Sequence, residues 1–99
     1  MKTFLTTIVS PNGKTFDEQV EFLGVPAFDG SLGILARHAP LIALLKKGIL
    51  TVKVKGKEIL YAINNGIVEV DGESHALVLV DDALPANNRA HANDLLTKL

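Results

Sequence analysis

Residues 24–42, GVPAFDGSLGILARHAPLI, place a histidine, an arginine and an aspartate among glycines, prolines and aliphatic side chains. His38 is the residue here that could act as a general base, bind a metal, support the core or form part of a docking edge. A general base needs an orienting carboxylate and a nucleophile within reach. Asp29 is near in the sequence, but no Ser-His-Asp or paired-carboxylate pattern surrounds His38. Structural and docking roles therefore remain for it, and both stay open.

The spacing of the histidines and of two glycines could also indicate a binding site. His75 and His91 lie in unrelated segments, so the three histidines lack the spacing of a metal site. Gly30 and Gly33 are spaced as in some phosphate-binding loops, but no Lys-Ser/Thr pair follows them. We interpret the glycines as turn residues that permit positive φ angles. The sequence thus predicts no catalytic residue, no metal site and no cofactor.

The composition indicates one folded domain. The chain has 99 residues, of which 47% are hydrophobic and 21% charged, values typical of a globular protein. Ten basic and eleven acidic residues give a net charge of −1, so no basic footprint for nucleic acid is present. The absence of cysteine excludes disulfides, zinc–thiolate sites and a thiol nucleophile.

Most of the chain alternates apolar and polar residues with a period of two, which is typical of β-strands. Glycine-, proline- or asparagine-containing turns are expected at residues 11–13, 56–57, 64–66 and 71–72. The strands expected between them are residues 2–10, 19–25, 31–35, 49–54, 58–63, 67–70 and 75–80. Several short strands at this spacing, with no helical window before residue 80, predict an all-β sandwich or barrel.

The end of the chain has a different pattern. Residues 81–86, with Pro85, are expected to be a linker. Residues 87–99 predict a short helix that Asn87 or Asn88 could cap. Its apolar face would consist of Ala92, Leu95, Leu96 and Leu99. A helix of this length is marginal alone in water and must pack on a neighbouring surface.

Three stretches, taken in order, resemble one known family. Residues 20–41 contain Val-Glu-Phe, Val-Pro, Asp-Gly-Ser-Leu-Gly-Ile-Leu and His-Ala-Pro-Leu. Residues 48–70 contain Gly-Ile-Leu and Ala-Ile-x-x-Gly-x-Val-Glu-Val, and residues 77–83 read Leu-Val-Leu-Val-Asp-x-Ala. Together they resemble the epsilon subunit of bacterial and chloroplast F-type ATP synthases, which is called delta in the mitochondrial enzyme.

The resemblance implies a fold and a function. It implies a mainly β protein, with a ten-stranded antiparallel β-sandwich over residues 1–83 and a short helical tail over residues 84–99. It also implies a non-catalytic subunit of the central stalk, or rotor, at the cytoplasmic face of the bacterial inner membrane or the equivalent side in an organelle. Such a subunit is peripheral, binds the gamma subunit and the c-ring, and couples proton transport to ATP synthesis.

The resemblance also implies two sets of contact residues. Residues expected to contact the c-ring are Asp29, Gly30, Ser31, Leu32, Gly33 and His38. Residues expected to contact gamma are Phe16, His38, Ala39, Pro40 and Leu41. Many relatives carry an acidic residue at the position of Ser31, so one charged c-ring contact is expected to be absent here.

The tail departs from the family pattern. Relatives usually follow the sandwich with two helices that can inhibit ATP hydrolysis, whereas the residues after Ala83 suffice here for one short helix, which would be too short to reach the catalytic subunits. Of the family's ATP-binding pattern this chain keeps Arg89-Ala90, but Pro85 and Ala86 replace the aliphatic residue and the aspartate. Nucleotide binding would therefore depend on Arg89. The alternative, a free-standing β-sandwich that binds a small ligand such as a nucleotide, stays open on sequence grounds.

Overall fold

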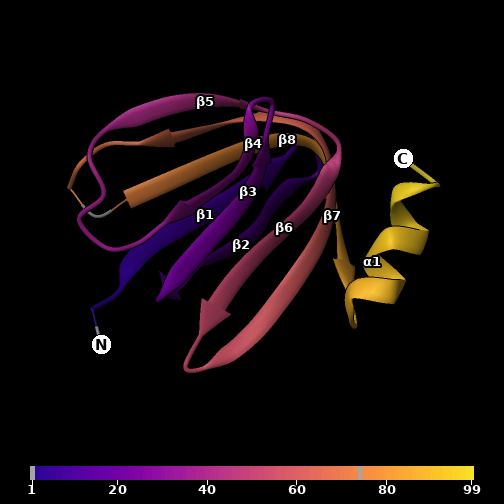
Figure 1. Cartoon of the computed structure of the whole chain (residues 1–99), viewed down its shortest axis with the longest axis horizontal. Coiled ribbons are helices and arrows are strands. Elements are labelled where there is room, and N and C mark those ends of the chain that lie inside the picture. Colours follow the sequence, from indigo (N-terminus) through magenta and orange to yellow (C-terminus); the bar gives the residue numbers. More distant parts are fainter. Residues whose placement is uncertain (1, 74) are drawn as a thin grey trace.

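The alternating segments of the sequence form eight β-strands, and the tail forms one helix (Figure 1). A computed structural model describes residues 2–73 and 75–99. The mainly β class and the short C-terminal helix are thus confirmed. In chain order the elements are β1 (Phe4–Ser10), β2 (Gly13–Val20), β3 (Phe22–Ala27), β4 (Gly30–Ile34), β5 (Leu41–Leu45), β6 (Gly48–Val54), β7 (Lys57–Val70), β8 (His75–Ala86) and α1 (Arg89–Leu96).

The predicted count of ten strands is wrong, because two long strands replace shorter ones. Residues 64–66 were expected to form a turn, but β7 passes through them, with Asn65 at a φ of 27°. Gly66 permits this path, because a Cβ atom there would collide with the carbonyl oxygen of Leu79 on β8. Residues 81–86, expected to be a linker, form the second half of β8, and residues 82–86 pair with residues 60–64 of β7.

The strands form one hydrogen-bonded sheet that folds over itself into two layers (Figure 1). Its order is β2-β1-β8-β7-β5-β3-β4, and β6 pairs with both β3 and β7. The bent strand β7 serves both layers, because residues 57–63 pair with β6 and residues 66–70 pair with β5. The prediction of purely antiparallel pairing is also wrong for one pair. β1 and β8 run parallel, which the long stretch of chain between them allows.

The core lies between the two layers and is filled by alternate residues of most strands. Ile8, Val68 and Val78 come from one layer, and Leu50 and Ile63 come from the other; all five are fully buried. This is the hydrophobic-in alternation that the sequence showed. Such burial of aliphatic side chains is the main source of the stability of the sandwich.

Turn chemistry agrees with the sequence at the β6–β7 hairpin. Val54 pairs with Lys57, which leaves Lys55 and Gly56 as a two-residue loop. Both loop residues have positive φ angles, 51° and 78°, as a tight hairpin of the type I′ family requires. The turn predicted at residues 56–57 is therefore present, displaced by one residue.

Helix α1 packs on the outer side of the β7–β8 part of the sheet (Figure 1). Asn88 caps it by accepting a hydrogen bond from the His91 backbone N–H at 2.8 Å, as the sequence allowed. Leu60 and Ala62 alternate with core residues, so they point outward, and both are nevertheless buried. Ala92 of α1 is fully buried as well, which identifies the helix as their cover. No helix among residues 2–73 and 75–99 is long and apolar enough to span a membrane.

Candidate partner-binding face

The residues predicted to contact the c-ring lie in two places. Asp29 and Gly30 form the turn between β3 and β4, beside the end of β5, where the Phe28 N–H donates to the Leu44 carbonyl at 3.2 Å. His38 precedes the opposite end of β5, which begins at Leu41. The length of β5 therefore separates the two groups, by roughly 15 Å at 3.3 Å per residue.

His38 lies in the loop between β4 and β5 and is held by local bonds. Its Nδ1–H donates to the carbonyl oxygen of Ala39 at 2.7 Å, and its backbone N–H donates to the carbonyl of Leu35 at 3.2 Å. The side chain is half-buried, whereas Ala39 and Pro40 are exposed and Leu41 is half-buried. These contacts orient the ring toward its own loop and leave it without an acidic partner among the described residues.

Phe16 occupies a different environment from the other predicted gamma contacts. It is only 7% exposed, and its ring packs edge-on against Tyr61 at a centroid distance of 6.3 Å. It therefore belongs to the core and supplies little surface for docking. The burial alternation of β2 explains this, because its inward residues are Phe16 and Val20.

Gly33 has a packing role on the second layer. It pairs with Gly24 across β3 and β4, and the Phe22 ring lies close to both glycines. Together with Ser31 and Leu32 they line an open cleft of about 390 Å³. Arg89 borders this cleft, and its guanidinium pairs with the Glu58 carboxylate at 3.6 Å. The only residue predicted for nucleotide binding is thus engaged in an exposed ion pair.

An apolar surface that the residue predictions missed lies on the outer side of the other layer. On β5, Ile42 is 66% exposed and Leu44 62% exposed. The strand registers align Leu44 with Ile67 of β7, Ile67 with Leu79 of β8, and Leu79 with Val9 of β1. A second row begins at Ile42 and includes Leu77. The outer apolar face is defined here as Val9, Ile42, Leu44, Ile67, Leu77 and Leu79.

A sequence signal for this face exists. β5 reads Leu-Ile-Ala-Leu-Leu, and residues 76–80 of β8 read Ala-Leu-Val-Leu-Val. Neither run alternates with polar residues, so both faces of these strands are apolar. Such runs are typical of strands that are covered on both sides. One side of each run contacts the core, and the structure shows no cover on the other within the described residues.

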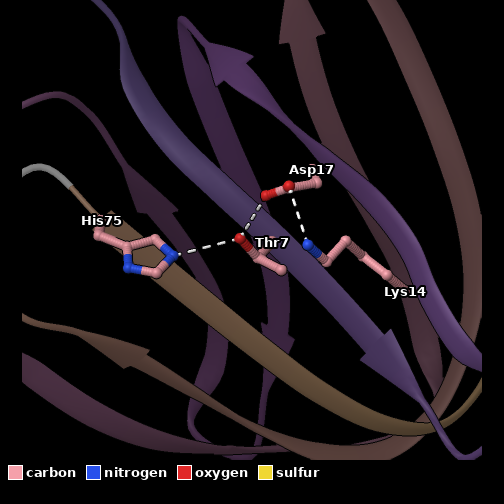
Figure 2. Close-up of polar contacts among 4 residues, drawn as sticks. All are labelled: Thr7, Lys14, Asp17 and His75. Atoms are coloured by element: carbon pink, nitrogen blue, oxygen red, sulfur yellow. Dashed lines mark hydrogen bonds and ion pairs between the residues drawn. The ribbon is translucent and has the colours of Figure 1, made fainter.

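A polar network borders this face on β2, β1 and β8 (Figure 2). The Thr7 hydroxyl donates to Oδ1 of Asp17 at 2.8 Å, and the Lys14 ammonium binds Oδ2 of the same carboxylate at 3.1 Å. Nε2 of His75 lies 3.2 Å from the Thr7 oxygen. Because the single hydroxyl proton goes to Asp17, the oxygen accepts from His75, which places a proton on Nε2.

The network stabilises the ionised form of Asp17. The hydrogen bond from Thr7 is the main cause that lowers the pKa of this carboxyl below 3.8, and the bond and charge of Lys14 add to it. The Asp17 carboxylate is exposed to solvent, so these bonds orient surface side chains and contribute little to the stability of the core. The three strands are thereby held in register beside the outer apolar face.

The site as a whole is suited to docking. Within residues 2–73 and 75–99, His, Asp and Glu side chains form no group of three or more that could hold a metal. Contiguous exposed apolar side chains with a polar rim have the anatomy of a protein interface. Fold and surface therefore define a small β-sandwich module with an exposed apolar face of the kind found in protein interfaces.

Comparison with known proteins specifies the family. Residues 3–86 match the model of the β-sandwich domain of the ATP synthase delta/epsilon chain. The chain belongs to this family, which confirms the resemblance seen in the sequence. It is 39% identical over 85 residues to the ATP synthase epsilon chain of Sulfurovum sp. (strain NBC37-1), covering 85% of this chain and 66% of that protein. It is 43% identical over 82 residues to the epsilon chain of Desulforamulus reducens, covering 83% of this chain and 61% of that protein.

Solved structures confirm the fold. A chain in the mitochondrial ATP synthase of Euglena gracilis, in a structure of OSCP, F1 and the c-ring, matches with a TM-score of 0.81 at 22% identity. The match covers 97% of this chain and 62% of that one. A chain in the central stalk and c-ring structure from Tetrahymena thermophila matches with a TM-score of 0.73 at 17% identity, over 84% of this chain and 66% of that one. This chain spans just under two thirds of the length of the two relatives described.

Proposed function

We propose that this chain is an epsilon subunit in the central stalk of an F-type ATP synthase. It binds the gamma subunit and the c-ring, and it couples transmembrane proton flow to ATP synthesis while other subunits carry out catalysis. Membership of the delta/epsilon family over residues 3–86 supports this proposal. The protein would then be peripheral, at the cytoplasmic face of the inner membrane or its organellar equivalent.

The observation that carries the proposal is the outer apolar face. Leu44 and Ile42 expose more than half of their surface on a rigid strand, next to Ile67 and Leu79. Removing apolar surface from water contributes about 25 cal/mol per Å². Covering this face with an apolar surface of gamma would therefore favour assembly. Pro40 is exposed and directly precedes β5, so the predicted gamma contacts at residues 38–41 adjoin this strand in the sequence.

The proposed c-ring contact uses the turn at Asp29 and Gly30 and the start of β4. Asp29 and Ser31 are exposed, and Gly30 has a φ of 121° that favours glycine. We propose that this exposed turn contacts polar loops of the ring. His38, at the other end of β5, is proposed to contact gamma and the ring from the loop before that strand.

Affinity purification from the source cell's own membranes tests the function. The tagged wild-type chain should recover gamma and the catalytic subunits. Leu44→Asp should lose them, because a charge would be placed in the covered face. Ala90→Asp is the control, since Ala90 is exposed on α1 and lies outside the outer apolar face. Failure of the wild-type chain to recover gamma, or equal loss in both variants, would contradict the proposal.

An ATP titration followed by amide NMR addresses the alternative function. The docking proposal predicts no saturable shifts at submillimolar ATP. Saturable shifts around the cleft beside Arg89 would instead favour a ligand-binding module. The two experiments are independent, so one can succeed while the other fails.

A further inference from the structure

Within the part of the chain that the structure describes, one carboxylate, that of Glu69, lies inside the outer apolar face. Glu69 of β7 is exposed, and it points to the same side as Ile67 because Val68 and Val70 are buried. Its cross-strand neighbours are Ile42 on β5 and Leu77 on β8. The charged group is thus flanked by apolar side chains on both adjacent strands and by Ile67 along its own strand.

The described residues offer Glu69 no counter-ion. The ion pairs found there join other residues, and no side-chain hydrogen bond reaches Glu69. Among the described residues, the basic side chains placed on this side of the sheet are Lys14, which already pairs with Asp17 at 3.1 Å, and His75, whose Nε2 lies 3.2 Å from the Thr7 oxygen. Lys14 is on β2, three strand spacings from β7, a distance of about 14 Å. In the free chain, therefore, water solvates this carboxylate.

Docking changes that situation. A partner that covers Ile42 and Leu77 also removes water from the carboxylate between them, and burying an unpaired charge is strongly unfavourable. A cation that the partner supplies at this position would offset that cost and favour the interface. The net charge near Glu69 is negative. Lys14 and Asp17 neutralise each other, and Asp71, directly after β7, adds a second carboxylate. A partner surface that is apolar with a basic side chain complements this pattern.

We propose that Glu69 is a specificity-determining anchor, which pairs with an arginine or lysine that gamma presents within an apolar docking surface. This inference rests on the proposed function, because gamma is taken as the occupant of the face. Glu69 is carried on a strand that is hydrogen-bonded on both sides, so its backbone is held in position before binding. Its apolar neighbours exclude water from the pair, which strengthens the interaction.

The test measures the affinity of the full chain for the gamma-containing F1 assembly from which the native copy of this chain has been removed. Glu69→Gln is compared with wild type and with Glu18→Gln, a matched change at an exposed residue outside the outer apolar face. Each dissociation constant is measured at about 50 mM and about 300 mM salt, where screening of charge pairs differs. Melting curves of the free variants show whether the fold is retained, and Glu69→Asp keeps the charge on a shorter side chain.

The expected result is a loss of affinity of about 10- to 100-fold for Glu69→Gln, a weaker salt dependence, and no change for Glu18→Gln. Glu69→Asp should retain more affinity than Glu69→Gln. If Glu69→Gln binds like wild type while Leu44→Asp does not bind, the inference is overturned and the proposed function stands. If wild type itself does not bind, both are overturned. A Glu69→Gln chain that melts like wild type and binds weakly at low salt supports the inference.

Discussion

The Thr7 hydroxyl joins three strands through one donated and one accepted hydrogen bond. It connects Asp17 on β2 to His75 on β8, while Lys14 holds the second oxygen of the carboxylate. Because Thr7 is largely buried, the bond to Asp17 is sheltered on one side even though the carboxylate is exposed. The ionised Asp17 side chain therefore helps to hold the edge strand β2 in register with β1.

This arrangement predicts a pH-dependent stability. The folded state lowers the pKa of Asp17 below 3.8, first through Thr7 and then through Lys14. The stabilisation is thus fully present above that value and is lost as the pH falls through the lower pKa of the folded state. Asp17→Asn should lower the melting temperature at pH 7, and the difference from wild type should shrink as the pH falls through the lowered pKa of the Asp17 carboxyl.

A double-mutant cycle provides the control for this prediction. Thr7→Val removes the main cause of the lowered pKa, so adding Asp17→Asn to it should have less effect than Asp17→Asn alone. Equal effects of Asp17→Asn in both backgrounds, or a difference from wild type that does not shrink as the pH is lowered, would contradict the role assigned to Thr7.

At the level of the elements, local patterns predicted the hairpins and the helix but not the long strands. Lys55-Gly56 and Asn88 act through local backbone geometry, which a sequence window contains. The path of β7 through residues 64–66 depends on a close approach to β8, which lies elsewhere in the chain. Asn-Asn-Gly has turn composition, and tertiary pairing overrides that preference.

Helix α1 supplies a prediction about its own packing. Ala92 is fully buried against the sheet, whereas Ala90 on the same helix is exposed. Ala92→Glu should therefore place a charge under the helix and lower the free energy of unfolding by about 1–3 kcal/mol. Ala90→Glu should change it by less than about 0.5 kcal/mol.

Urea unfolding of the two glutamate variants measures this difference. Both substitutions add the same side chain to the same helix, so a difference between them reports burial and not helix propensity. Equal stabilities of the two variants would show that α1 is not packed on Leu60 and Ala62 in solution, despite their burial in the structure.

On the scale of the whole molecule, composition and period two predicted an all-β domain, and the family resemblance predicted the sandwich. The outer apolar face was harder to predict, because its two rows come from β1, β5, β7 and β8 and exist only once the registers are set. Leu44 and Leu79 are indistinguishable from core residues in the sequence. Phe16 is the opposite case. It was predicted to contact gamma at the surface, but it is buried and packs on Tyr61.

His38, in the loop before β5, is a proposed contact at the opposite end of this strand from the turn at Asp29. Among the described residues, His38 hydrogen-bonds to backbone groups of its own loop, through Ala39 and Leu35, so His38→Ala should leave the melting temperature of the isolated chain nearly unchanged. If His38 contacts gamma and the ring, the same variant should weaken binding to the assembled enzyme and lower proton pumping per ATP hydrolysed. The matched control is His91→Ala on α1, whose ring accepts a hydrogen bond from the backbone N–H of Asn87, in the short connection between β8 and α1. Reconstituted vesicles measure both quantities, and equal pumping by the two variants would show that the loop before β5 makes no coupling contact.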